Sequence, residues 1–133
     1  MTNRVLIAGI GCRRNVATDD IIGLVRQALA DAGGGGALTA LAAPRFKEDE
    51  PALREAAATL GVGLTLVEDA ALEAAQPRCV THSACAERSA GVASVAEGAA
   101  LAAAGPEGVL VLPRISNARA TCALARPRIG GGS

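Results

Sequence analysis

The chain has 133 residues, which is enough for one domain with one hydrophobic core and too short for two. Half of the residues are hydrophobic, yet the chain has one phenylalanine and no tyrosine or tryptophan. Thirteen basic and thirteen acidic residues give a formal net charge of zero. This composition argues against a general nucleic-acid-binding protein, which needs excess positive charge for phosphates and aromatic rings for stacking.

The first half of the chain alternates strand and helix patterns. Arg4 to Ile10 is predicted as a buried strand because its central residues are continuously apolar. A helix is predicted over residues 18–32, with Thr18 as its capping residue and two aspartates in its first turn. Four glycines at 33–36 end this helix in a loop that we expect to be mobile. Ala37 to Ala42 is predicted as the second strand.

The pattern then repeats with shorter elements. Asp49 is predicted to cap a second helix that has Pro51 in its first turn and stops at Gly61. A third strand is predicted over Gly63 to Val67, followed by a short helix over Asp69 to Ala75. Both runs are bounded by residues that favour turns or caps.

The third quarter of the chain holds a stretch that is hard to interpret and a helix that is easy to interpret. We predict a short extended start and a helical turn for residues 79–91. Ser94 and Glu97 then have the spacing of a capping box, which opens an alanine-rich helix that ends at Gly105. In a capping box the Glu97 carboxylate binds the backbone of Ser94. One carboxylate oxygen would still remain to hold an active-site water, so Glu97 is also a candidate catalytic residue.

Two strands close the pattern, over residues 108–112 and 119–125. The link between them, 113–118, is too short for a crossover helix, so the two strands should form a hairpin. The predicted fold is therefore an α/β, three-layer α/β/α sandwich with a mainly parallel, mixed sheet of about five strands. Residues 1–126 form the single predicted domain and 127–133 a flexible tail.

In open α/β sheets, ligands bind beyond the carboxyl ends of the strands. The loops predicted there are 9–15, 44–47, 83–94 and 113–119, and three of them carry a net positive charge. Arginine forks pair with carboxylates or phosphates in bidentate fashion, so an anionic ligand is one interpretation. The other is that these side chains are simply solvated. Five basic residues from these loops are expected to converge there: Arg13, Arg14, Arg45, Lys47 and Arg114.

The sequence contains three further candidate sites. Gly9-x-Gly11 lacks the third glycine of a dinucleotide-binding motif, so the glycines serve either a tight turn or a close approach of backbone to ligand. His82 has Ser83, Cys85 and Glu87 as neighbours, but members of a catalytic set must converge in space and need not be adjacent in sequence. Cys12 is either a reactive thiol at the strand end or a small buried residue.

Cysteine spacing and hydropathy exclude further classes. The four cysteines, Cys12, Cys79, Cys85 and Cys122, form no CxxC pair, and a metal site from Cys79, His82 and Cys85 would need a ligand from elsewhere. No apolar segment approaches the roughly 20 residues of a membrane span, and no signal peptide is indicated. We expect a cytoplasmic protein with reduced thiols, no metal, no cofactor of its own, and no nucleic-acid or membrane partner.

Four segments, taken in order, are similar to one family. Residues 9–13 read GIGCR, 47–53 fit K-x-x-E-x-x-L, and 91–101 fit G-V-x-S-V-x-E-x-A-A-L. Residues 110–114 with 120–125 resemble its closing strand, which ends in Pro-Lys and is followed by T-x-A-x-A. Arg114 stands where this family usually has lysine, which keeps the charge but changes the geometry. The chain resembles the C-terminal domain of CbiG, a domain also found alone as the CobE proteins.

The resemblance implies a role in cobalamin biosynthesis and a precorrin or hydrogenobyrinic-acid-type ligand, whose many carboxylates suit a basic rim. It leaves three hypotheses open: a carrier, a hydrolase similar to the CbiG-type cobalt-precorrin-5A hydrolase, and a subunit docking on another enzyme of the pathway. Glu97 is the catalytic candidate. The predicted ligand-binding residues are Gly9, Gly11, Cys12, Arg13, Arg14, Lys47, Gly91, Ser94, Pro113, Arg114 and Thr121.

Overall fold

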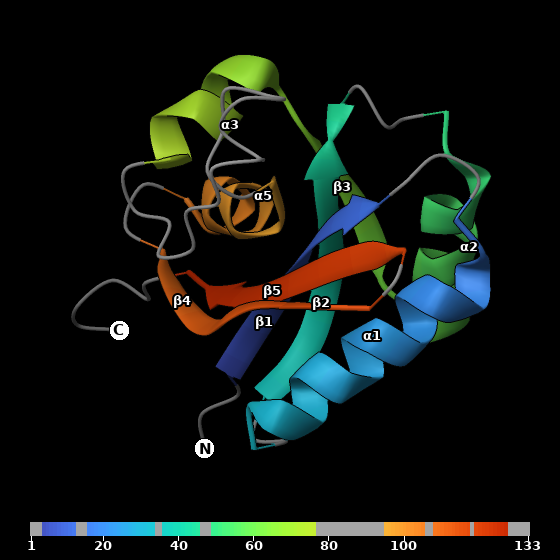
Figure 1. Ribbon diagram of the computed structural model, residues 1–133. Coiled ribbons are helices and arrows are strands. Elements are labelled where there is room, and N and C mark those ends of the chain that lie inside the picture. Colours follow the sequence, from blue (N-terminus) through green and yellow to red (C-terminus); the bar gives the residue numbers. More distant parts are fainter. Residues whose placement is uncertain are drawn as a thin grey trace.

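The computed structural model describes residues 4–12, 16–33, 36–45, 49–76, 95–105, 108–117 and 119–127. These residues form an alternating series of strands and helices (Figure 1). In chain order the elements are β1 (Arg4–Cys12), α1 (Thr18–Asp31), β2 (Gly36–Pro44), α2 (Pro51–Leu60), β3 (Gly63–Val67), α3 (Asp69–Ala75), α5 (Val95–Ala104), β4 (Val109–Ser116) and β5 (Ala120–Arg126).

The strands form one five-stranded sheet in the order β3-β2-β1-β5-β4. Strands β1, β2 and β3 are parallel, whereas β5 runs antiparallel to both β1 and β4. Strand β4 therefore points the same way as β1, and β1 to β4 all end at one edge of the sheet, where β5 begins. We call this the carboxyl edge. The predicted mixed sheet and its closing hairpin are confirmed.

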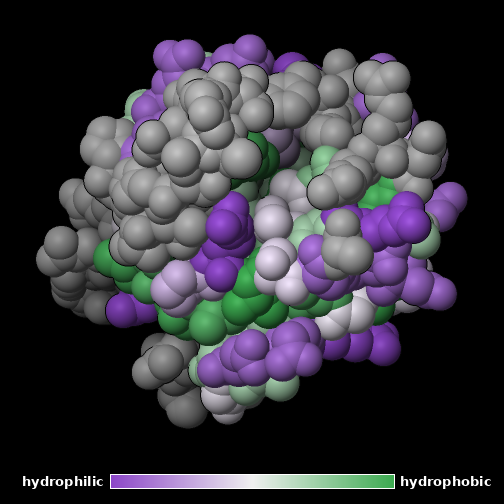
Figure 2. All heavy atoms as spheres, in the orientation of Figure 1, coloured by the Kyte–Doolittle hydropathy of each residue, from purple (hydrophilic) through white to green (hydrophobic). Residues whose placement is uncertain are grey.

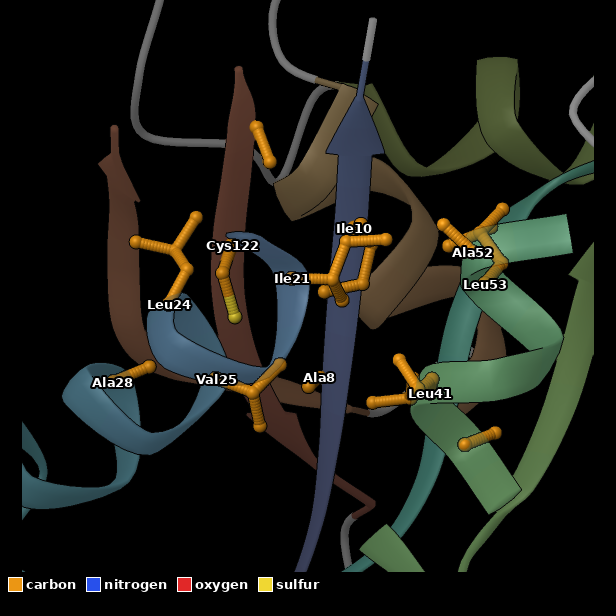
Figure 3. Close-up of a cluster of buried hydrophobic side chains, with 14 of the residues drawn as sticks. Ala8, Ile10, Ile21, Leu24, Val25, Ala28, Leu41, Ala52, Leu53 and Cys122 are labelled. Carbon is orange, nitrogen blue, oxygen red and sulfur yellow. The ribbon is translucent and has the colours of Figure 1, made fainter. Parts of the chain in front are cut away.

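Helices α1 and α2 cover one face of the sheet, which we call the α1/α2 face. Their amphipathic surfaces place branched side chains against β1, β2 and β5. Figure 3 shows Ile21 of α1 beside Ile10 of β1, with Leu24 and Val25 of α1 on one side of this strand and Leu53 of α2 on the other.

Helices α3 and α5 cover the opposite face, which we call the α5 face. Helix α5 is apolar around most of its circumference, as expected for a helix held between the sheet and another layer. Its alanines and Leu101 pack with Ile7, Ala42 and Ala125 of the sheet and with Leu72 of α3. Helices therefore lie on both sides of the sheet, which confirms the predicted three-layer sandwich.

Three strands are longer than predicted, and the difference moves several candidate site residues from loops into the sheet. Strand β1 continues through Gly9 and Gly11 to Cys12, and β2 continues to Pro44. Strand β4 continues through Pro113 to Ser116. Proline is tolerated there because β4 is an edge strand whose register with β5 shifts on either side of Leu112.

The helix ends show both correct and wrong predictions. Helix α2 stops at Gly61 in the left-handed conformation, as predicted. The predicted caps Thr18 and Asp49 are wrong, because the residues at the N-cap positions are Ala17 and Glu50, and neither makes a side-chain cap bond. The Thr18 hydroxyl instead donates to Glu55 Oε1 of α2 at 2.6 Å, so it joins the two helices of its layer.

Three predictions fall outside the described residues: the conformation of 79–91, the capping role of Ser94, and the tail from 128 onward. These remain predictions.

Candidate functional site at the carboxyl edge

The two glycines of β1 let helix α5 lie directly on the strand. A Cβ atom on Gly9 would overlap the carbonyl oxygen of Ala96 and lie 2.6 Å from the Ala100 nitrogen. Neither glycine has a positive φ, so the tight-turn interpretation is wrong. The close approach that requires glycine at position 9 is the approach of a helix backbone within the protein.

Glu97 lies on α5 immediately after the residue that touches Gly9. Its side chain is fully buried, and it is the one charged side chain buried among the described residues. The backbone N–H of Arg114 donates to Glu97 Oε2 at 2.9 Å. A buried carboxylate is tolerated when it accepts such bonds, and no buried side-chain nitrogen or oxygen in the described part of the chain lacks a partner. The contact links helix α5 to strand β4.

Arg114 reaches this carboxylate because β4 is irregular at that point. The register with β5 shifts between Leu112 and Ile115, so the backbone between them does not follow the regular ladder. Ile115 packs against the α1/α2 core, whereas the backbone N–H of Arg114 faces Glu97 on helix α5. Its side chain is half-buried, and its guanidinium makes no hydrogen bond or ion pair within the described structure.

Thr121 of β5 completes the group on the α5 face. It pairs with Gly11 of β1 on one side and with Ser116 of β4 on the other. Its hydroxyl lies 3.4 Å from the Gly11 carbonyl oxygen, and a Cβ on Gly11 would come within 2.6 Å of it. The described residues that the fold brings together at the carboxyl edge are Gly9, Gly11, Glu97, Pro113, Arg114 and Thr121.

Cys12 does not join this group. It packs against the core of the α1/α2 face and is half-buried, so its side chain lies on the opposite side of the sheet from Glu97. Cys122 lies deeper on the same face, where burial raises the pKa of its thiol to about 12. Neither cysteine stands beside the buried carboxylate, so the structure offers no thiol–carboxylate pair among these residues.

Arg45 follows β2 at the carboxyl edge, as predicted, but its guanidinium forms an ion pair within the protein. Its Nε donates to Glu68 Oε2 at 2.5 Å, and Glu68 follows β3. Sequence reasoning missed Glu68, although an acid directly after the neighbouring parallel strand was a usable signal. Of the two described cations of the predicted rim, Arg114 is thus the one whose guanidinium is not in an ion pair.

Asn117 fastens the β4–β5 hairpin at the same edge. Its Oδ1 accepts the backbone N–H groups of Arg119 and Ala120, each at 2.8 Å, and its Nδ2 donates to the Asp20 carbonyl of α1 at 3.1 Å. The hairpin turn is therefore fixed to the helix layer, which adds to the order of the strand that carries Arg114.

Several predicted site residues lie outside the described residues, and their roles remain predictions: Arg13, Arg14, Lys47, Cys79, His82, Cys85, Gly91 and Ser94. In the rest of the chain no three histidine, cysteine or carboxylate side chains are grouped as metal ligands. No helix in the described segments has the length and apolarity to cross a membrane.

The surface over β4 and β5 is partly apolar. Figure 2 shows hydrophobic side chains at the level of these strands and hydrophilic side chains below them over α1. Most of the apolar side chains are half-buried, and Val109 is the one large hydrophobic residue exposed within the described residues.

Comparison with known proteins agrees with this architecture. Solved structures of proteins from cobalamin biosynthesis have a similar fold. Residues 6–125 match the family model of the cobalamin synthesis G C-terminus. The chain therefore belongs to this family of cobalamin biosynthesis proteins, which includes CobE.

Individual relatives support the assignment. The chain is 40% identical over 123 residues to protein CobE of a Sinorhizobium species, covering 92% of this chain and 80% of the relative. A crystal structure of CobE, from the cobalamin (vitamin B12) biosynthetic pathway, has a TM-score of 0.84 at 38% identity, covering 96% of this chain and 93% of the other.

Two further solved structures are similar. The cobalamin biosynthesis protein chiG from Agrobacterium tumefaciens has a TM-score of 0.74 at 35% identity, with coverages of 93% and 99%. A putative cobalamin biosynthesis protein G homolog from Sulfolobus solfataricus has a TM-score of 0.74 at 21% identity, and the match covers 96% of this chain but 38% of that one. This last likeness concerns the fold alone.

Proposed function

We propose that the protein binds a carboxylate-rich corrin intermediate of cobalamin biosynthesis at the carboxyl edge of its sheet, as a carrier or accessory protein. The observation that carries the proposal is the half-buried residue Arg114, which lies at that edge and whose guanidinium is in no ion pair. A guanidinium can bind a carboxylate through two parallel hydrogen bonds, and late corrin intermediates carry many carboxylates.

The burial and hydrogen bonding of Glu97 favour a binding function over hydrolysis. Its side chain is fully buried, and one of its oxygens accepts the Arg114 N–H. A general acid or base must come within hydrogen-bond reach of the reacting group, directly or through one water. A carboxylate that is closed off from solvent and already bonded to backbone is better suited to holding the protein together.

The test is a titration of the purified protein with hydrogenobyrinic acid, followed by absorbance, with the mass of the released ligand as a second readout. Arg114→Ala is expected to raise the Kd at least tenfold, because a charge-assisted hydrogen bond contributes about 1.5–3 kcal/mol and about 1.4 kcal/mol is a factor of ten. Arg126→Ala is the matched control, since Arg126 is an exposed arginine of the same hairpin at the opposite edge.

Each outcome assigns the function. Binding with unchanged ligand mass and an effect confined to Arg114 supports the carrier. A changed ligand mass makes the protein an enzyme, as the hydrolase hypothesis holds. Equal effects of both arginine variants place the ligand elsewhere, and no binding at all favours a subunit that docks on another pathway protein.

A further inference from the structure

We propose that Glu97 is a positioning residue: its carboxylate holds the Arg114 backbone, so that the Arg114 side chain extends from a fixed position toward a ligand carboxylate. This inference rests on the proposed function and deepens it, because it assigns a role to the one charged side chain that is buried among the described residues.

The first step is that helix α5 is held closely between the sheet and helix α3 at the position of Glu97. The residue before Glu97, Ala96, has its carbonyl against Gly9 of β1 with no room for even a Cβ atom. The residue after it, Gly98, lies against α3, where a Cβ would come within 2.5 Å of Gln76 Nε2. The backbone on both sides of Glu97 is therefore fixed by contacts in opposite directions, one to the sheet and one to the neighbouring helix.

The second step is that the Arg114 segment needs an external support. It lies in an edge strand, next to a proline that has no N–H, where the ladder with β5 is irregular. A backbone N–H in such a segment must find a partner outside the ladder or remain bonded to water. The bond of 2.9 Å from Arg114 N to Glu97 Oε2 supplies that partner from the rigid helix.

The third step concerns the side chain that extends from this backbone. Fixing the backbone of Arg114 limits the positions that its side chain can reach, so less conformational entropy is lost when the guanidinium binds a planar carboxylate. Glu97 thus acts through Arg114 and not on the ligand itself. The property that matters is its reach as a hydrogen-bond acceptor, and not its negative charge.

Two substitutions distinguish the effect of the Glu97 side-chain length from the effect of its negative charge. Glu97→Gln removes the charge but keeps an oxygen at the same distance along the side chain, and Glu97→Asp keeps the charge but shortens the side chain by one methylene. The amide resonance of Arg114 and its hydrogen exchange, measured by ¹⁵N NMR, report the bond directly. Absorbance titration with hydrogenobyrinic acid reports binding. Glu73→Gln on the exposed surface of α3 is the matched charge control.

The expected result is that Glu97→Gln keeps the Arg114 amide protected and the Kd within about threefold of the original protein. Glu97→Asp should lose both the protection and about tenfold in affinity, the upper end of what one hydrogen bond contributes. In the Arg114→Ala background, Glu97→Asp should have little further effect, because residues that act through each other are not additive.

The opposite result overturns the proposal: if Glu97→Asp binds the ligand as tightly as the original protein does and Glu97→Gln binds it more weakly, the role of Glu97 is electrostatic. An Arg114 amide that is unaffected by either substitution also overturns it. A changed ligand mass that Glu97→Gln abolishes assigns Glu97 to catalysis instead. If the original protein does not bind hydrogenobyrinic acid at all, the proposed function fails as well. That result differs from binding whose Kd is unchanged by the Glu97 substitutions.

Discussion

The two faces of the sheet are packed by different means. On the α1/α2 face, branched side chains such as Ile10, Ile21 and Leu53 interdigitate, and each helix keeps a polar outer side. On the α5 face, glycine and alanine predominate, and the helix backbone comes against the strand backbone. The first face is held by side-chain volume and the second by backbone proximity.

This difference explains where polar groups can be held in order. A packed aliphatic layer gains its stability from apolar burial and has no place for a carboxylate. A layer in which backbones approach closely has little volume to adjust, so a group mounted on it keeps its position. Glu97 lies on the helix of that second layer, beside the contact of Ala96 with Gly9. The candidate site therefore uses the stiffer of the two faces.

Gly9→Ala should disrupt the packing of the α5 face and have the largest effect on stability. The added methyl would overlap backbone atoms of Ala96 and Ala100, which cannot rotate away as a side chain can. Overpacking of a core usually costs about 1–3 kcal/mol, and because the obstacle here is backbone we expect the free energy of unfolding to fall by about 4 kcal/mol or more. Urea denaturation monitored by circular dichroism measures the change.

Gly23→Ala provides the matched control. Gly23 lies on the exposed side of α1 with nothing within 4 Å of an added Cβ. The same substitution should stabilise the protein there by about 0.5–1 kcal/mol, because alanine loses less backbone entropy in a helix. Equal effects at both positions would mean that backbone proximity does not distinguish the faces.

The α1/α2 face should be destabilised by the opposite kind of substitution, one that removes side-chain volume. Leu53 is fully buried in α2 within the aliphatic cluster. Leu53→Ala is expected to reduce the free energy of unfolding by about 3 kcal/mol, within the usual range of about 2–5 kcal/mol for such cavities. Leu60→Ala in the same helix, at a half-buried position, should cost clearly less. Thermal and urea denaturation of the two variants decide the point.

The layered fold could be predicted because it depends on local periodicity. Apolar runs, helix spacing and a link too short for a crossover were sufficient for the order of elements and for the final hairpin. The extension of β4 through Pro113 was not predictable, because proline normally ends a strand and its tolerance here depends on the edge position and the shifted register. The same applies to Gly9, whose role depends on a helix almost 90 residues away.

The site was predictable in location and less so in contacts. The rule that ligands bind beyond the carboxyl ends of strands selected Arg114 and Arg45 correctly as residues of that edge. It did not indicate that Glu68 engages Arg45, or that Glu97 accepts the Arg114 N–H. Such contacts join elements that are distant in sequence, and single-sequence patterns carry little information about them.

The smallest expected effect concerns alkaline pH and the thiol of Cys122 on the α1/α2 face. Burial raises the pKa of this thiol from 9.0 to about 12 in the folded protein. Above pH 9 the unfolded chain ionises the thiol and the folded chain does not. Stability present below pH 9 is therefore lost progressively as the pH rises toward 12. Between pH 8 and pH 10 the loss should be about 1.4 kcal/mol, one pKa unit of differential ionisation.

Cys122→Ala isolates this contribution, because alanine cannot ionise and fits a face that already contains Ala8 and Ala28. The chain has no tyrosine and one lysine, and its three other cysteines are present in both proteins and therefore cancel in the comparison. The variant should lose some stability at pH 7 through lost packing, but its stability should decline less steeply between pH 8 and pH 10. Denaturant midpoints measured across that range give both slopes. Parallel slopes would mean that the thiol is accessible in the folded state, and the tight aliphatic packing inferred for this face would then be wrong around Cys122.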